Sequence, residues 1–93
     1  MKSEIKVSII LPTLNEKKNL EILIPSIVKE FDELTIQDYE ILVVDDNSTD
    51  GTKYIMNKLK KRNIRYYIRK KDRDLIKSCV FGFRKSKYDN ILV

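Results

Sequence analysis

The hydrophobic positions along the first third of the chain predict a strand followed by a helix. Lys6–Leu11 is an apolar, β-branched run that ends at Pro12, which predicts a buried strand. From Lys17 onward, apolar residues recur at helical spacing and predict one buried helix face. The members of this stripe are Leu20, Leu23, Ile24, Ile27, Val28 and Phe31. Pro25 lies inside the stripe and is expected to kink or split the helix, because its ring clashes with the preceding turn.

The rest of the chain alternates between the same two patterns. Tyr39–Val44 is almost continuously apolar, which predicts a strand that is covered on both faces. A second helix is expected over Gly51–Lys61, with Tyr54, Ile55 and Leu59 facing inward. Ile64–Ile68 predicts a third strand, Arg73–Lys85 a third helix, and the residues from Asn90 a fourth strand. The expected buried stripe of the third helix contains Leu75, Ile76, Cys79, Val80 and Phe83, with Cys79 as a small core residue.

This order of elements predicts an α/β fold with a small parallel sheet of about four strands, because each connection is long enough for a helix. At 93 residues the chain makes at most one domain. Its last residues, Asn90–Val93, begin an apolar run, so we expect residues 1–93 to form an incomplete domain. Ligands of parallel sheets bind outside the carboxyl ends of the strands. The loops at residues 12–16 and 45–50 are therefore the candidate binding loops.

The composition limits the partners and metal ligands that this chain can have. The net charge is +5, and much of the basic excess lies between Lys53 and Lys77. Such residues suit phosphates or an anionic membrane surface, but no aromatic ladder accompanies them, so we expect a solvated face and no nucleic-acid partner. With one Cys and no His, the chain cannot form an internal disulfide or a cysteine or histidine zinc site. Oxygen ligands for Mg²⁺ or Mn²⁺ remain, and the cytoplasm is the default location.

Asp45 and Asp46 are the most informative polar residues, because they follow the second strand directly. Adjacent carboxylates repel each other unless one meets a donor or a cation. Strand alternation sends the two side chains in opposite directions, so only one should face a cleft. The loop at residues 12–16 has no glycine, which excludes a dinucleotide-binding turn or a Walker loop there. The run ILVVDDN (41–47) is also similar to the opening strand of a response-regulator receiver, which stays open as an alternative.

A longer resemblance covers nearly the whole chain. VSIILPTLNEKKNL (7–20) and YEILVVDDNSTDGT (39–52) resemble the amino-terminal half of family 2 glycosyltransferases in order and spacing. Arg73–Ser78, Gly82 and Ile91–Val93 resemble the branch that contains the dolichol-phosphate mannose synthases. The resemblance implies a Rossmann-like half-domain that binds a nucleotide sugar. It also implies a sheet in the order third, second, first and fourth strand.

The family's binding positions carry over only where residues match. The resemblance implies that Pro12, Glu16 and Asp46 contact the base, with Asp46 accepting from a ring N–H. Leu14 stands where the family commonly has a stacking Tyr, and this leaves the identity of the base in doubt. Arg69 or Arg73 would meet the pyrophosphate. The implied nucleotide-binding set is Pro12, Leu14, Glu16, Asp45, Asp46, Arg69 and Arg73.

The implied reaction is sugar transfer from a GDP- or UDP-sugar, with a polyprenyl phosphate at the membrane surface as an acceptor. The full-length family uses Mg²⁺ or Mn²⁺ held by an Asp-x-Asp motif that follows a strand like Asn90–Val93. We therefore expect no catalytic or metal-binding residue in this chain, but a nucleotide-binding fragment without turnover. An inert fragment is the remaining alternative. The uncovered edge of the fourth strand predicts self-association.

Overall fold

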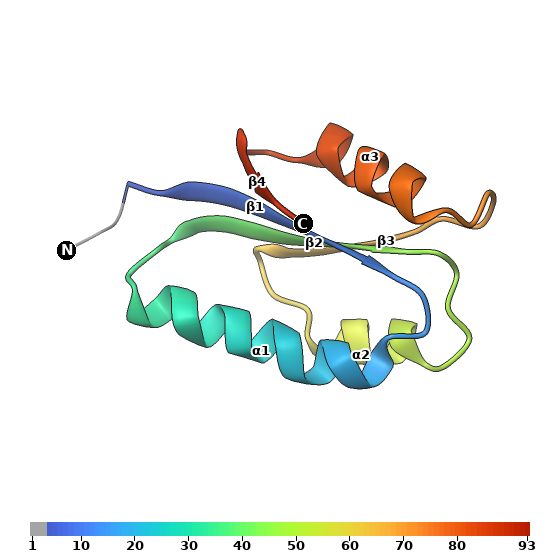
Figure 1. Ribbon diagram of the computed structural model, residues 1–93. Helices are drawn as coiled ribbons and strands as arrows, with labels where there is room; N and C mark the ends of the chain where they lie inside the picture. The colour runs from blue at the N-terminus through green and yellow to red at the C-terminus, as the bar shows by residue number, and fades with distance from the viewer. Residues whose placement is uncertain (1–3) are drawn as a thin grey trace.

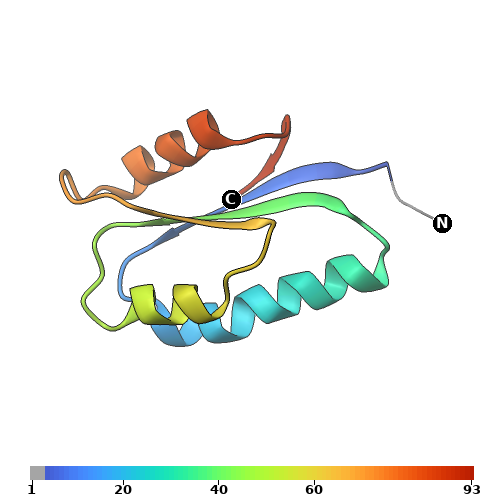
Figure 2. The same ribbon diagram turned by 180° about the vertical axis from the view of Figure 1, so that it is seen from behind.

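Residues 4–93, which the computed structural model describes, alternate strands and helices in the predicted order. The strands are β1 (Lys6–Thr13), β2 (Asp38–Asp45), β3 (Ile64–Ile68) and β4 (Asn90–Leu92). The helices are α1 (Lys17–Glu33), α2 (Thr52–Lys58) and α3 (Leu75–Lys85). Helices α1 and α2 cover one face of the sheet and α3 lies on the other, as Figures 1 and 2 show from opposite sides. The loops that follow β1, β2 and β3 meet at one end of the sheet (Figure 1).

The sheet has four parallel strands in the order β3-β2-β1-β4, which confirms the predicted fold class and strand order. Thr13 is in register with Asp45, so β1 and β2 end side by side. A receiver has the order 2-1-3-4-5, in which the acidic strand lies between the next two strands along the chain. Here β2 lies between β3 and β1, and β4 pairs with β1 instead. The receiver alternative is therefore wrong.

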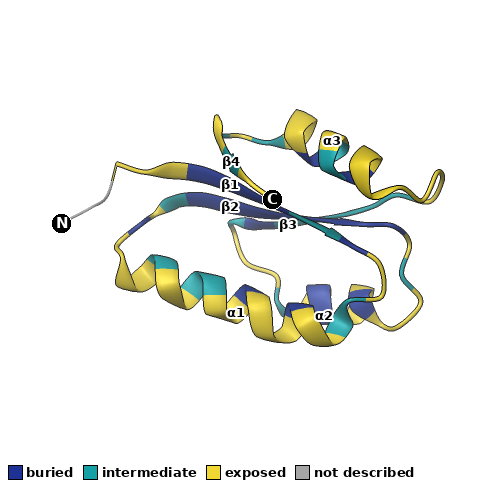
Figure 3. Ribbon diagram, viewed as in Figure 1, coloured by how far each residue is buried: buried dark blue, intermediate teal, exposed yellow. Residues whose placement is uncertain are grey.

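The main core lies between the sheet and α1. Strand β2 is buried from Tyr39 to Asp45, as its continuous hydrophobicity predicted (Figure 3). Tyr39 packs edge-on against Phe31 of α1, with ring centroids 4.6 Å apart. Helix α1 runs through Pro25 without a break, so the predicted split does not occur. Leu23 is exposed, whereas the rest of the predicted α1 stripe is buried or packs against the core.

Helix α2 is shorter than predicted, and of the three residues predicted to face inward Ile55 is buried, Leu59 packs against the core and Tyr54 does neither. It ends at Lys58, and its buried residues are Thr52, Ile55 and Met56. Tyr54, predicted to face inward, is exposed and lies under the ammonium of Lys58 at 4.7 Å. The prediction for Tyr54 was wrong because a helix of two turns offers too few apolar positions to define its buried face.

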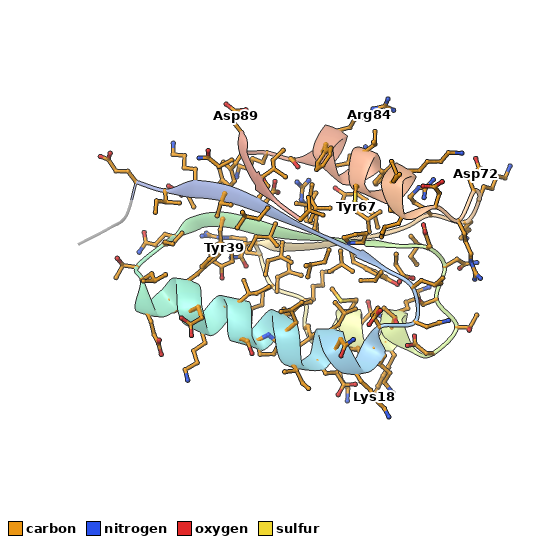
Figure 4. The ribbon with its side chains drawn as sticks, in the orientation of Figure 1. Lys18, Tyr39, Tyr67, Asp72, Arg84 and Asp89 are labelled. Atoms are coloured by element: carbon orange, nitrogen blue, oxygen red, sulfur yellow. The ribbon has the colours of Figure 1, made fainter. Side chains whose placement is uncertain are left out.

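Helix α3 does not bury the apolar stripe that the sequence predicted for it. Its buried residues are Ser78 and Gly82, while Cys79 is only half-buried. The other four members of the expected stripe are exposed, namely Leu75, Ile76, Val80 and Phe83. The phenyl ring of Phe81 packs instead against Tyr67 of β3, and Figure 4 shows Tyr67 between the sheet and α3. Small residues face the sheet because the helix backbone lies close to it. No helix within residues 4–93 is long and apolar enough to cross a bilayer.

Candidate functional site at the carboxyl ends of the strands

The loops after β1 and β2 are interlocked. The amide of Asn15 donates to Ser48 Oγ at 2.7 Å, and the amide of Thr49 donates to Asn15 Oδ1 at 2.9 Å. Asn15 and Asn47 have positive φ angles of 55° and 61°, a conformation that Asn tolerates better than most residues. The two predicted binding loops therefore form one structural unit at the carboxyl edge of the sheet.

Asp45 ties this unit together from inside. Its carboxylate accepts from Thr13 Oγ1 at 2.6 Å, from Ser48 Oγ at 2.6 Å and from the Ser48 amide at 2.8 Å. Tyr66 of β3 adds a longer contact from its hydroxyl at 3.3 Å. Burial raises the pKa of Tyr66, and the negative charge of Asp45 raises it further, so this hydroxyl stays protonated as a donor. Protein donors therefore surround the carboxylate of Asp45, and this residue does not line the candidate cavity.

Asp46 points to the opposite face, toward α3, as strand alternation predicted. Its Oδ1 accepts from Ser78 Oγ at 2.7 Å and from Arg69 Nη1 at 3.0 Å. Its Oδ2 accepts from the amide of Asp74 at 3.2 Å. Arg69 and Asp46 form an ion pair in which both side chains are largely buried. Asp46 therefore connects the end of β2 with the start of α3.

Arg73 lies across the turn that follows β2. Its Nε donates to the carbonyl oxygen of Asp46 at 3.1 Å, and its Nη2 donates to that of Asn47 at 3.0 Å. The guanidinium has five N–H donors, so several remain for a ligand. The loop before it turns at Asp72, which has a φ of 56° and stands at the loop tip in Figure 4. Arg73 is thus held by backbone oxygens while its charge stays accessible.

A cavity of about 270 Å³ opens between the β1 loop and the start of α3. It is lined by Pro12, Thr13, Leu14, Glu16, Asp46, Arg73, Asp74 and Leu75. Five of the seven predicted residues therefore line it, whereas Asp45 and Arg69 do not. Asp74 caps α3 by accepting from the amide of Lys77, and an Asp just before a helical pattern is a recognisable capping signal. Ser78 carried no such signal, because a buried Ser on a helix is unremarkable in sequence.

A larger cavity, of about 460 Å³, lies elsewhere, beside the amino-terminal ends of β2 and β3. Its notable residue is Glu40, a buried carboxylate that accepts from Ser8, from the Lys87 amide and from Arg65. Burial would raise the pKa of Glu40, but these hydrogen bonds outweigh burial and hold the pKa below its usual value. All three donors belong to the protein, so the Glu40 carboxylate is already paired without a ligand. We prefer the smaller cavity as the functional site because parallel sheets bind ligands at the carboxyl ends.

The carboxylates of the site do not fit a divalent metal ion. No group of three or more potential metal-ligating side chains occurs among the described residues. Asp50 accepts from the amides of Lys17 and Thr52, and the Thr52 hydroxyl holds its pKa below the usual value. Asp45 and Asp46 are likewise surrounded by protein donors.

Comparison with known proteins gives a consistent picture. The model of the family described as "Glycosyl transferase family 2" matches residues 8–93. A dolichol-phosphate mannosyltransferase from Pyrococcus furiosus is 37% identical over 89 residues, covering 95% of this chain and 24% of the relative. A dolichol-phosphate mannosyltransferase from Mycosarcoma maydis is 32% identical, covering 86% of this chain and 29% of the relative.

A third relative has a different sugar acceptor in its name. It is the GalNAc(5)-diNAcBac-PP-undecaprenol beta-1,3-glucosyltransferase of Campylobacter jejuni, 35% identical over 65 residues. The match covers 68% of this chain and 20% of that relative. The chain thus spans between a fifth and a third of the length of these relatives.

Proposed function

This chain belongs to glycosyl transferase family 2, and on that premise we propose that its cavity binds the nucleotide of a nucleotide-sugar donor. The observation that carries the proposal is the buried carboxylate of Asp46 at the wall of a cavity outside the carboxyl ends of β1 and β2. Such a position is where ligands of parallel sheets bind. The proposed donors are GDP- and UDP-sugars.

Each wall of the cavity suits a different part of a nucleotide. Leu14 and Pro12 supply an apolar surface for the base, although Leu cannot stack on it as an aromatic ring would. Asp46 accepts a hydrogen bond from a ring N–H. Arg73, whose remaining donors are free of the backbone contacts, binds the diphosphate. Arg69 neutralises Asp46 and holds it in place, instead of meeting the diphosphate itself.

For the whole protein we propose sugar transfer from the nucleotide to a polyprenyl phosphate. The names of two relatives, dolichol-phosphate mannosyltransferases, support this acceptor class. An acceptor of that kind would bring the protein to a membrane surface from the cytoplasmic side. Because the chain spans only part of its relatives, we expect it to bind nucleotide without turning over the donor. Mg²⁺ or Mn²⁺ would act in the full-length family, held by residues other than those described here.

Titration with UDP and GDP, followed by amide NMR shifts, tests the nucleotide site. We expect shifts at the β1 loop and at Arg73. Asp46→Asn should weaken binding by about 1.5–3 kcal/mol, because a charge-assisted hydrogen bond is lost. Asp89→Asn is the matched control, since Asp89 is exposed and distant from the cavity (Figure 4). Shifts confined to the basic stretch of residues 58–71 would contradict the proposal and indicate unspecific attraction of phosphate. No shifts at all would favour the inert-fragment alternative.

A further inference from the structure

Helix α3 turns large apolar side chains away from the sheet. Its buried residues, Ser78 and Gly82, are small and face the strands. Ile76, Val80 and Phe83 follow one another at i, i+4 and i+7, so they form one stripe on the outer side of the helix (Figure 3). Their exposed fractions are 73%, 38% and 43%. A contiguous apolar stripe of this kind, left in solvent, is typical of an interaction surface.

Basic residues border this stripe. Lys77 and Arg84 follow Ile76 and Phe83 by one position each, so they lie in the next row around the helix. Both are exposed, and Figure 4 shows Arg84 pointing away from the sheet. Residues 70–87 contain seven Lys or Arg and two Asp, so their net charge of +5 equals that of the whole chain. The positive excess is therefore concentrated in the segment that exposes the apolar stripe.

This combination suits an anionic bilayer better than it suits other partners. An interfacial helix places apolar side chains among the lipid headgroups while Lys and Arg beside them contact anionic lipids. A nucleic acid would bind the positive charges but would leave the apolar stripe in water. A second copy of this chain that docked α3 on α3 would bring equal positive charges together, and these repel each other.

We propose that the outer face of α3 is a docking surface for an anionic phospholipid membrane. Ile76, Val80 and Phe83 lie among the headgroups, and Lys77 and Arg84 bind the anionic ones. The helix lies in the plane of the membrane surface, because its other side packs on the sheet through Ser78 and Gly82.

This contact also orients the candidate cavity. Leu75, the first residue of α3, is 65% exposed and lines that cavity together with Arg73. The apolar surface of α3 therefore begins at the mouth of the cavity, and a polyprenyl phosphate in the bilayer would lie beside it. Only this link to an acceptor rests on the proposed function. The membrane contact depends on α3 alone and is tested without nucleotide.

Vesicle flotation gives the first test, because bound protein rises with the vesicles in a density gradient whereas aggregates sink. Vesicles of phosphatidylcholine are compared with vesicles of equal parts phosphatidylcholine and phosphatidylserine. We expect the chain to bind the anionic vesicles about tenfold more tightly, and added salt to weaken this binding. Equal binding to both compositions, or no binding, would overturn the proposal. Nucleotide titration without lipid would still report on the proposed function, so the two can fail separately.

Two matched pairs of variants locate the contact. Ile76→Ser should weaken binding to anionic vesicles about fivefold, whereas Ile22→Ser should not, because Ile22 is 70% exposed on α1 across the sheet (Figure 1). Arg84→Gln should also weaken it about fivefold, whereas Lys18→Gln, the same change of charge on α1, should not (Figure 4).

The controls make the docking face falsifiable. All four substituted residues are exposed, so the fold should persist in each variant. Equal losses within each pair would overturn a contact through α3 and indicate unspecific adsorption. If Ile76→Ser abolishes self-association in sedimentation but leaves vesicle binding unchanged, a second copy of the chain covers α3 and the proposal is wrong.

Discussion

Gly82 of α3 lies directly on Ile10 of β1. A Cβ atom added at Gly82 would stand 2.6 Å from Ile10 Cγ2, closer than such contacts occur, and Ile10 is fully buried. The absence of a side chain thus lets α3 approach the sheet. This close approach brings Ser78, one helical turn earlier, within hydrogen-bonding distance of Asp46.

Gly82→Ala should therefore destabilise the chain in spite of the better helix propensity of Ala. Overpacking of a core typically costs about 1–3 kcal/mol, against about 1 kcal/mol gained from propensity. Urea denaturation measures the difference. The double variant Gly82→Ala with Ile10→Val should recover part of the loss, because the shorter side chain makes room. Full stability of Gly82→Ala alone would show that the helix can shift without cost.

Asp45→Asn should reduce the stability of the fold. Asp45 is 1% exposed and accepts from Thr13, Ser48 and Tyr66, and an amide would turn its NH₂ group toward one of these donors. Loss of charge-assisted hydrogen bonds to a buried carboxylate costs about 1.5–3 kcal/mol. Thermal unfolding of Asp45→Asn, with Asp38→Asn as a control at the opposite end of β2, measures the loss. Equal melting temperatures for Asp45→Asn and the control would contradict the structural role of Asp45.

The low pKa of Glu40 predicts acid sensitivity. A carboxyl group whose pKa is lower in the folded state than its usual value of 4.5 stabilises the fold above that value. This contribution is lost as the pH falls below 4.5 toward the folded-state pKa, because the folded protein must then bind a proton against its hydrogen bonds. Denaturation series between pH 6 and 3 should show a drop in stability that Glu40→Gln partly removes. The same pH dependence in Glu40→Gln would assign the acid sensitivity to other groups.

Two apolar surfaces predict self-association. Strand β4 lies at an edge of the sheet, with Leu92 exposed, and α3 exposes Leu75 and Ile76. Leu92→Lys should lower the sedimentation coefficient of an associated species if pairing occurs through the edge. The double variant Leu75→Ser, Ile76→Ser should lower it if the helix face is responsible. Leu34→Ser is the control, because Leu34 is an exposed leucine at the end of α1. If neither the Leu92 variant nor the double variant lowers the sedimentation coefficient, the contact lies elsewhere.

The sequence by itself determined the order of the elements and the parallel sheet, and it predicted where the candidate site lies. Periodicity distinguishes strands from helices, and connections long enough for a helix favour parallel pairing. Alternation along β2 predicted that Asp45 and Asp46 point in opposite directions, which their hydrogen-bond partners confirm. The strand order came from resemblance to a family, and the pairing of β4 with β1 confirms it.

Only the tertiary structure decided which face of α3 is buried and which partners hold Asp46. An apolar stripe on α3 predicted a buried face, yet Ser78 and Gly82 face the sheet, because the distance between helix and sheet selects small residues there. The bond between Ser78 and Asp46 joins residues 32 positions apart in the chain. No local pattern encodes such a pair, since it depends on how closely two elements approach after folding. The acceptor capacity of Asp46 was therefore invisible in the sequence.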